Sequence, residues 1–281
     1  MFSITLHPLS SRYQLDGVRW LLQNCISGIS SGGLLCDEMG LGKTIQAACA
    51  LACRSQVGNS CVVCPKSLVL NWEKEIKKFI PEDVLHVTTY TPSSSTRQRD
   101  LGHLQEVLRQ GRTCVIFSYP TMRSELTKAD SVLALNWEIC VLDEGHFIRN
   151  TDLQLFAAAR AITANHRIVL SGTPVQNCLD DVYGMFEFLA PGFFPSYDHF
   201  YEYYAKPIVQ GYRSHRREQV VQGNARLEEL NRVISPFILR RTKEEVKLEI
   251  PSKNMSDVEC PLSETQISVY VQGADCHHCI D

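Results

Sequence analysis

Two short motifs place residues suited to phosphate chemistry next to apolar runs. The first, Asp37-Glu38-Met39-Gly40-Leu41-Gly42-Lys43-Thr44, lies between the apolar run 32–36 and a helical pattern over 44–53. Glycines in such a turn let backbone amides approach a phosphate at the positive end of the helix. The lysine would neutralise the β- and γ-phosphates of a nucleotide, and the threonine would offer its hydroxyl to Mg²⁺. The motif predicts a phosphate-binding loop; a glycine-containing turn without a ligand is the alternative, since Asp37 replaces the usual glycine.

The second motif, Asp143-Glu144-Gly145-His146, follows the apolar run 139–142. Its carboxylates emerge at the C-terminal end of a predicted strand, which is the edge where ligands bind in open α/β sheets. Asp143 is suited to hold Mg²⁺, and Glu144 to orient or deprotonate an attacking water. The alternative is a solvated acidic pair that caps the next helix. Two phosphate-chemistry motifs in one chain argue against that alternative.

The elements that must position these motifs alternate between strands and helices. Apolar runs of strand length without polar alternation predict a buried parallel sheet, over residues 32–36, 61–64, 113–117, 139–142 and 167–170. Helical spacing over 44–53 and 67–79 predicts helices that cover this sheet. The polar segment 91–99 predicts an exposed loop. The predicted fold class is therefore α/β, a parallel sheet flanked by helices.

The composition is that of a globular protein. The 281 residues are 44% hydrophobic, and 28 Lys+Arg against 31 Asp+Glu give a formal charge of −3. This excludes a disordered tail and a collagen-like repeat, and any nucleic-acid binding must use local patches. No uncharged apolar stretch approaches the roughly 18 residues of a membrane-spanning helix, and the first residues do not form a secretory signal. We expect no membrane partner and an intracellular compartment with reduced thiols.

The cysteines do not indicate a clear metal site. Cys61 and Cys64 lie three residues apart on a predicted strand, so they face opposite sides and cannot share a metal ion. The segment Cys276-His277-His278-Cys279 is suggestive, but zinc sites draw on two separated ligand pairs. No second pair is evident, so we expect no metal there.

Past about residue 191 the predicted elements become mostly helical. The aromatic cluster between Tyr197 and Tyr204 is predicted to be core rather than a stacking platform for bases. Arg213, Arg216 and Arg217 form a basic stretch, for which a solvated helical face is favoured over a further DNA patch.

A third motif, Ser171-Gly172-Thr173, follows the apolar run 167–170. Gly-Lys-Thr, Asp-Glu-x-His and Ser-Gly-Thr in this order resemble the first motor lobe of superfamily two helicases. Longer strings narrow the resemblance to the SWI/SNF-type ATPases; they cover 13–21, 37–44, 64–68, 118–119 and 235–241. In this family the phosphate loop usually begins with aspartate, which explains Asp37. The resemblance covers roughly residues 9–270.

Within the family, the segments 143–150 and 205–208 are most similar to the ATPases that remove TATA-binding protein from promoters. Recombination-type and Cockayne-syndrome-type translocases share Gly145 and stay as alternatives. The resemblance implies a RecA-like P-loop NTPase lobe over 1–190, a helical protrusion over 191–250, and a linker toward a second lobe with an unplaced tail over 251–281.

The resemblance also implies roles for individual residues. ATP-binding residues would be Gln14, Asp37, Glu38, Met39, Gly40, Leu41, Gly42, Lys43 and Thr44. Glu144 and Lys43 would be catalytic, and Thr44 and Asp143 would hold Mg²⁺. Residues that couple nucleotide state to lobe movement would be His146, Ser171, Gly172 and Thr173. Residues that contact the DNA backbone would be Lys66, Ser67, Ser118 and Tyr119.

The implied function is that of a nuclear DNA-dependent ATPase or translocase that remodels protein–DNA complexes with ATP and Mg²⁺. Expected partners are double-stranded DNA, TATA-binding protein or nucleosomes, and a second RecA-like lobe in cis or trans. That lobe carries the arginines that reach the γ-phosphate, so we expect very slow hydrolysis by this polypeptide alone. The alternative is a hydrolysis-incompetent fragment that binds nucleotide and DNA as a scaffold or dominant negative. A small-molecule kinase would leave the motifs at 143–146 and 171–173 unexplained.

Overall fold

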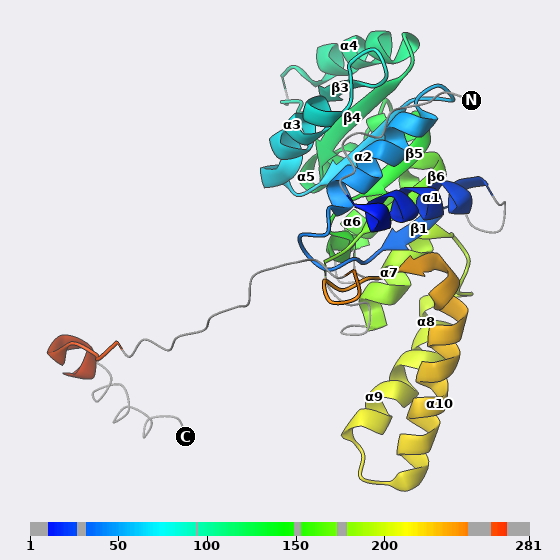
Figure 1. The fold of residues 1–281 in the computed structure, drawn as a ribbon, viewed down its shortest axis with the longest axis vertical. Helices are drawn as coiled ribbons and strands as arrows, with labels where there is room; N and C mark the ends of the chain where they lie inside the picture. Colours follow the sequence, from blue (N-terminus) through cyan, green and yellow to red (C-terminus); the bar gives the residue numbers. More distant parts are fainter. Residues whose placement is uncertain are drawn as a thin grey trace. The chain divides into compact units, whose positions relative to one another are not determined.

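A seven-stranded parallel sheet forms the centre of the computed structural model (Figure 1). The structure describes residues 11–26, 32–93, 95–148, 153–172, 179–246 and 260–268. The strand order is β3-β4-β2-β5-β6-β1-β7. The strands are β1 (Gly32–Leu35), β2 (Ser60–Cys64), β3 (His86–Thr89), β4 (Thr113–Ser118), β5 (Asn136–Leu142), β6 (Thr163–Leu170) and β7 (Ile238–Leu239). Every adjacent pair is parallel, so the carboxyl ends of the strands share one edge of the sheet.

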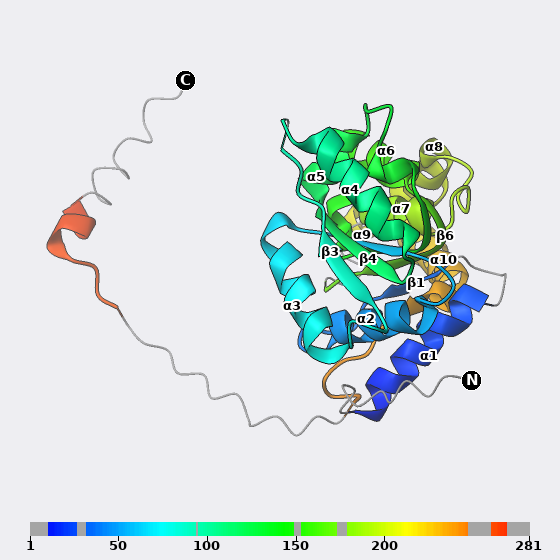
Figure 2. The ribbon, with the colours of Figure 1, turned by 90° about the horizontal axis from the view of Figure 1, so that it is seen from above.

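Helices cover both faces of the sheet (Figure 2). One face carries α1 (Arg12–Ile26), α2 (Lys43–Arg54) and α3 (Val69–Phe79). The other carries α4 (Arg97–Arg109), α5 (Tyr119–Glu125), α6 (Leu153–Ala161) and α7 (Leu179–Leu189). Short turns of helix lie at η1 (Lys66–Leu68), η2 (Val132–Ala134), η3 (Gly145–Ile148) and η6 (Ser235–Phe237). The predicted α/β class is confirmed, since strands buried on both faces need this arrangement.

The apolar runs become the central strands because both of their faces are buried. β2 is buried along its whole length, and its side chains alternate between the two hydrophobic cores. Cys61 packs into the core beneath α5 and α6, whereas Cys64 packs into the core beneath α2 and α3. The prediction that the two thiols face opposite sides is therefore confirmed.

Two of the strands were not predicted, and one helix begins inside a predicted loop. β3 and β7 are short, and neither is fully buried, so they lack the continuous apolar run that marks the other strands. The predicted loop over 91–99 is wrong at its end, because α4 begins at Arg97. The Arg97 guanidinium donates to both carboxylate oxygens of Glu125 at 2.7 and 2.8 Å. This long-range ion pair is accompanied by a local hydrogen bond from the Thr96 hydroxyl to the carboxylate of Asp100 at 2.5 Å.

Helices α8 (Tyr197–Phe200), α9 (Lys206–Arg213) and α10 (Arg217–Ile234) project from the sheet domain (Figure 1). A π-helical segment, η5 (Tyr201–Ala205), joins α8 to α9. Phe200 and Tyr204 are buried as predicted, but Tyr201 is 43% exposed. The basic stretch at the turn between α9 and α10 is exposed to solvent.

Two glycines set the close approach of α9 and α10. A Cβ on Gly223 would lie 2.9 Å from the carbonyl oxygen of Pro207 and 3.0 Å from the Cα of Gly211. Both contacts are with backbone, which cannot move aside as a flexible side chain can.

Gly223→Ala is therefore expected to lower the free energy of unfolding by about 1–3 kcal/mol, because overpacking outweighs the better helix propensity of alanine. Gly102→Ala in α4 is the matched control, since a Cβ there meets nothing within 4 Å. It is expected to stabilise by about 0.4–1 kcal/mol. Urea unfolding of both variants checks the opposite signs, and equal effects would contradict the packing argument.

Residues 1–246 form one compact unit and 247–281 a second, in which the described residues include a short helix over 264–268.

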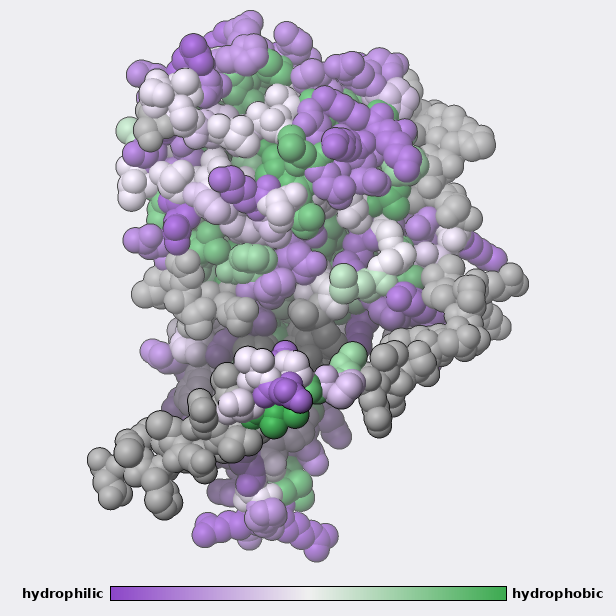
Figure 3. All heavy atoms as spheres, turned by 90° about the vertical axis from the view of Figure 1, so that its left-hand side faces the viewer, coloured by the Kyte–Doolittle hydropathy of each residue, from purple (hydrophilic) through white to green (hydrophobic). Residues whose placement is uncertain are grey.

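On the face of the protein seen in Figure 3, hydrophobic residues form small separate patches among hydrophilic ones. In the part of the chain that the structure describes, no helix has the length and apolar character to cross a membrane.

Candidate nucleotide-binding site

A cavity of ≈ 540 Å³ lies where the segments after β1 and β5 meet helices α1, α2 and α3. Its lining includes most of the residues predicted to bind nucleotide or metal or to be catalytic: Gln14, Met39, Gly40, Gly42, Lys43, Thr44, Asp143 and Glu144. The phosphate-loop motif and the acidic motif, which are about a hundred residues apart in the sequence, therefore border the same space. Three residues of α3 also line it, namely Asn71, Glu75 and Phe79, as do Ile45 and Leu68.

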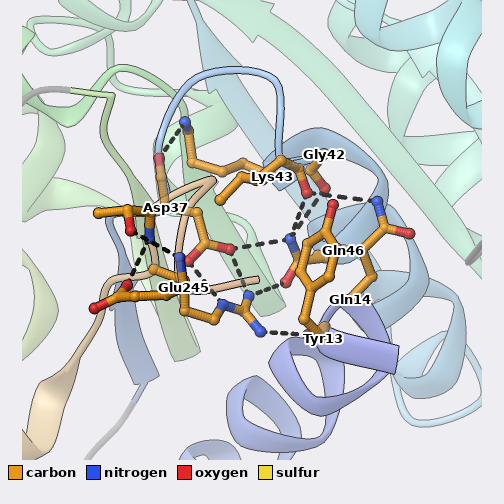
Figure 4. A network of polar contacts seen from close by, with 10 residues as sticks. Tyr13, Gln14, Asp37, Gly42, Lys43, Gln46 and Glu245 are labelled. Carbon is orange, nitrogen blue, oxygen red and sulfur yellow. Dashed lines mark hydrogen bonds and ion pairs between the residues drawn. The ribbon is translucent and has the colours of Figure 1, made fainter. Parts of the chain in front are cut away.

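The phosphate loop needs its glycines for their backbone conformation. Gly40 and Gly42 have φ values of 91° and 77°, in the left-handed region that favours glycine. α2 begins directly after Gly42, so its free amides face the loop. The Nζ atom of Lys43 donates to the carbonyl oxygen of Asp37 at 2.7 Å, within the same loop (Figure 4).

Asp143 is held in place by three hydrogen bonds from different elements. Its Oδ2 accepts from Trp72 Nε1 at 2.7 Å, and its Oδ1 from the Glu144 amide at 3.0 Å. Its carbonyl accepts from the Tyr119 hydroxyl at 2.8 Å. Burial raises the pKa of the Asp143 carboxyl above its ordinary value, and the Trp72 hydrogen bond opposes this rise. Burial also raises the pKa of Tyr119, which keeps its hydroxyl protonated as a donor.

Glu144 has a strained backbone. Its φ of 53° is rare for a residue with a side chain, and such strain is often concentrated at functional sites. The Glu144 Oε2 lies 3.3 Å from His146 Nδ1, close enough for an ion pair when the histidine is protonated, although the two are not aligned as a hydrogen bond. An added Cβ on Gly172 would lie 3.9 Å from both Glu144 Oε1 and Lys43 Nζ. Gly172 thus lies against both groups.

Gln14 lies beside the end of the phosphate loop. Its Nε2 donates to the carbonyl of Leu41 at 3.4 Å, and it would be 2.6 Å from a Cβ on Gly42. Its Oε1 is buried without a hydrogen-bond partner in the described structure, so an acceptor is available at the cavity wall.

Three predicted ATP-binding residues, Asp37, Glu38 and Leu41, do not line the cavity. The carboxylate of Asp37 is fully buried and pairs with Arg241. The carboxylate of Glu38 pairs with Lys243, which lowers its pKa chiefly by a hydrogen bond from the Lys243 amide. Leu41 is also fully buried, as a core residue at the loop. These side chains therefore shape the loop rather than face the cavity.

The predicted DNA-contacting residues separate into two pairs. Lys66 and Ser67 are exposed just after β2, at the carboxyl edge of the sheet. Ser118 and Tyr119 are 3% and 2% exposed, and a DNA contact at these two positions stays a prediction. Ser118 caps α5 by accepting from the amide of Thr121, and Tyr119 holds Asp143. Of the predicted coupling residues, Ser171 is buried at the end of β6, and Thr173 lies outside the described residues, as does the segment 276–279.

Sequence reasoning missed the roles of Trp72, Gln46 and Arg241. Trp72 was assigned only to the apolar face of a helix, and Arg241 only to a string shared with the family. Each acts through a contact between residues distant in the sequence, 71 positions apart for Trp72 and Asp143 and 204 for Arg241 and Asp37. A buried tryptophan usually needs a hydrogen-bond partner for its indole N–H, and this is the one feature of the sequence that could have indicated a polar role for Trp72.

Comparison with known proteins identifies the family. The model of the SNF2-related domain matches residues 13–279. The chain belongs to the SNF2-related family. It is 36% identical over 273 residues to the TATA-binding protein-associated factor BTAF1 of Arabidopsis thaliana, covering 93% of this chain and 13% of that protein. It is 37% identical over 276 residues to the TATA-binding protein-associated factor 172 of Homo sapiens, covering 92% of this chain and 14% of that protein.

A solved structure supports the same assignment. The SWI2/SNF2 ATPase core of Sulfolobus solfataricus, in complex with dsDNA, superposes with a TM-score of 0.67 at 29% identity. The match covers 94% of this chain and 52% of that one. The chain therefore has the SNF2-related ATPase fold, as the resemblance implied, and spans about a seventh of the length of the curated relatives named above.

The oxygen donors of the SNF2-related site suit Mg²⁺, the ion that this family normally uses with ATP. Mg²⁺ is usually bound by one or two carboxylates together with substrate phosphates and water. The Thr44 hydroxyl and the Asp143 carboxylate border the same cavity, and Trp72 orients the carboxylate. In the described residues no group of three or more His, Cys, Asp and Glu is placed to hold a metal ion.

Trp72→Phe is expected to weaken Mg²⁺-dependent ATP binding about tenfold, as loss of an outer-shell partner does. It removes a donor that favours the charged carboxylate, so the pKa of Asp143 rises further and the acid limb of ATP binding moves to higher pH.

Because the pKa of Asp143 is already raised in the folded wild-type chain, this group stabilises the fold at low pH. That contribution is lost as the pH rises from the ordinary pKa of an aspartate through the raised one.

Trp137→Phe is the matched control for Trp72→Phe. Trp137 is also buried, and its indole donates to the Val132 carbonyl at 3.2 Å, outside the lining of the cavity. Titration of a fluorescent ATP analogue against pH, with and without Mg²⁺, should separate the two variants. Equal losses of affinity would show that Trp72 acts only through packing.

Proposed function

We propose that this chain binds Mg²⁺·ATP and forms the ATPase lobe of a nuclear DNA-dependent translocase that remodels protein–DNA complexes. The observation that carries the proposal is the shared cavity of Lys43, Thr44, Asp143 and Glu144. The family relationship supports ATP hydrolysis, and the names of the two relatives favour TATA-binding protein on DNA as the substrate. We further propose residues 1–190 as the ATP-binding lobe, 191–250 as its protrusion, and 251–281 as the link toward a second lobe.

Each side chain has a defined task in the proposed reaction. Lys43 exchanges the Asp37 carbonyl for the β- and γ-phosphates, and the amides at the start of α2 bind phosphate oxygens. Thr44 and Asp143 would hold Mg²⁺, which when bound would neutralise charge on the phosphates. Glu144 orients a water for attack on the γ-phosphorus and accepts its proton. His146, Ser171, Gly172 and Thr173 are proposed to couple the nucleotide state to lobe movement. An added Cβ on Gly172 would lie 3.9 Å from both Lys43 Nζ and Glu144 Oε1.

DNA binding is proposed at the carboxyl edge of the sheet. Lys66 and Ser67 are exposed there, and phosphate contacts from such groups carry no sequence information. The Sulfolobus core that matches this fold is in complex with dsDNA, which favours the same partner for this chain. Binding to duplex DNA is expected to be independent of sequence and to weaken steeply with salt.

A hydrolysis-incompetent fragment is the second candidate function. In the resemblance, the arginines that reach the γ-phosphate belong to a second lobe, and the chain covers 52% of the Sulfolobus core. Such an arginine is worth about 10³–10⁵ in rate. As a scaffold or dominant negative, the chain would bind nucleotide and DNA without turnover.

The purified 281-residue polypeptide is therefore expected to bind Mg²⁺·ATP but to hydrolyse it at least about 10³-fold more slowly than a two-lobe motor of the family. Single-turnover assays with labelled ATP, with and without duplex DNA, measure this rate. Rapid DNA-stimulated turnover by the polypeptide alone would contradict the expectation, and absence of ATP binding would contradict the proposed function.

A further inference from the structure

The segment just after β7 lies against the phosphate loop. The Cys36 amide donates to the Leu239 carbonyl at 2.7 Å, and the Glu38 amide donates to the Arg241 carbonyl at 2.9 Å. The Lys243 amide donates to Glu38 Oε2 at 2.8 Å. The two segments therefore continue the β1–β7 pairing beyond the sheet, and the first half of the loop is bonded to residues about 200 positions later.

The Arg241 side chain donates to Asp37, Gln46 and Tyr13, three of the residues that Figure 4 labels. Its guanidinium forms a bidentate ion pair with Asp37, in which Nε donates to Oδ1 at 3.0 Å and Nη2 donates to Oδ2. Nη2 also donates to Gln46 Oε1 at 2.8 Å, and Nη1 donates to the carbonyl of Tyr13. One side chain thus joins α1, α2 and the beginning of the phosphate loop.

Through Asp37 and Gln46, Arg241 reaches both ends of the loop. Asp37 starts the loop, and its carbonyl is the acceptor of the Lys43 ammonium. Gln46 Nε2 lies 3.2 Å from the carbonyl of Leu41 and 3.3 Å from that of Gly42, at the end of the loop. It also donates to Asp37 Oδ2 at 3.2 Å. The network therefore fixes the span between the two ends.

The Asp37 carboxylate depends on this partner. Its side chain has no solvent exposure, and the Arg241 side chain is 14% exposed. A buried carboxylate that loses its cation must move to water or take up a proton. Arg241 does not border the cavity, so its effect on a ligand would be indirect.

We propose that Arg241 is a positioning residue for nucleotide binding, which holds the phosphate loop in its binding shape from outside the cavity. The inference rests on the proposed ATP site and adds to it a residue that touches no phosphate. Loss of the guanidinium would let Asp37 move and would displace the loop amides and Lys43 from positions suited to phosphates. Small displacements of this kind cost binding because the donors no longer converge.

The test compares Arg241→Met with Arg97→Met. Arg97 forms a similar bidentate ion pair with Glu125. The Arg97 side chain is 21% exposed and the Glu125 side chain 1%, and neither residue borders the cavity. Both variants are expected to lower the melting temperature. Only Arg241→Met is expected to weaken binding of a fluorescent ATP analogue, about tenfold to a hundredfold, the range for loss of an outer-shell partner.

Two further measurements keep the inference open to contradiction if Arg241→Met does not fold. Arg241→Lys keeps the charge but not the bidentate geometry, so its loss of ATP affinity is expected to be smaller than that of Arg241→Met. Hydrogen exchange of the amides over 38–42 should speed up in Arg241→Lys and not in Arg97→Met. Unchanged affinity and exchange in a folded Arg241 variant would overturn the inference, while failure of the wild-type chain to bind the analogue would overturn the proposed function instead.

Discussion

Glu144→Gln is expected to bind ATP with wild-type affinity and to hydrolyse it about 10²–10⁴-fold more slowly, the contribution of a general base. The amide keeps the size of the carboxylate and its place beside Gly172, but it cannot accept a proton from water. The backbone at residue 144 keeps its φ of 53°, since glutamine accepts this conformation no less readily than glutamate. The fold should therefore be unaffected.

Single-turnover hydrolysis with the protein in excess over labelled ATP measures this loss even when the wild-type rate is low. Glu75→Gln is a suitable control, because Glu75 borders the same cavity from α3 and has no proposed role in the reaction. Equal rates in wild type and Glu144→Gln would show that another group activates the water.

Lys43→Ala is expected to reduce ATP affinity by about one to two orders of magnitude, which corresponds to the roughly 1.5–3 kcal/mol of a charge-assisted hydrogen bond. Lys43 is the cation that would meet the phosphates, and it is already beside the loop because the Asp37 carbonyl accepts its ammonium. Asp37, which supplies that carbonyl, is fully buried, so loss of its donor should also lower the free energy of unfolding, by about 1–3 kcal/mol.

Equilibrium titration with the ATP analogue and a thermal melt distinguish the two effects in Lys43→Ala. Lys66→Ala provides the control, because Lys66 is exposed after β2 and does not border the cavity. That variant should bind ATP as the wild type does. Loss of affinity in both variants would indicate a general charge effect rather than a phosphate contact.

The central sheet could be predicted from the sequence because its strands are buried on both faces and are therefore continuously apolar. β3 could not, since its residues are mostly half-buried and mixed in polarity. α4 begins inside a segment of loop-like composition, where Arg97 makes an ion pair with Glu125, 28 residues away in the sequence.

The sequence motifs predict which residues border the cavity, but they do not predict the contacts that hold those residues in place. Lys43, Asp143 and Glu144 follow strands of one parallel sheet, so topology alone brings them to one edge. The carboxylate of Asp37 faces Arg241 rather than the cavity, and Tyr119 holds Asp143 rather than reaching solvent. Motif spacing identifies where the backbone passes, but the direction of a side chain depends on partners elsewhere in the fold.

The pairing between the phosphate loop and the segment after β7 has a consequence for biosynthesis. Asp37 and Arg241 are 204 residues apart, and non-local contacts of this kind form late. At about 5–20 residues per second, the ribosome needs about 10–40 s between the two. During that interval the nascent loop lacks its buried cation, so we infer that the site matures only after residue 241 has left the exit tunnel.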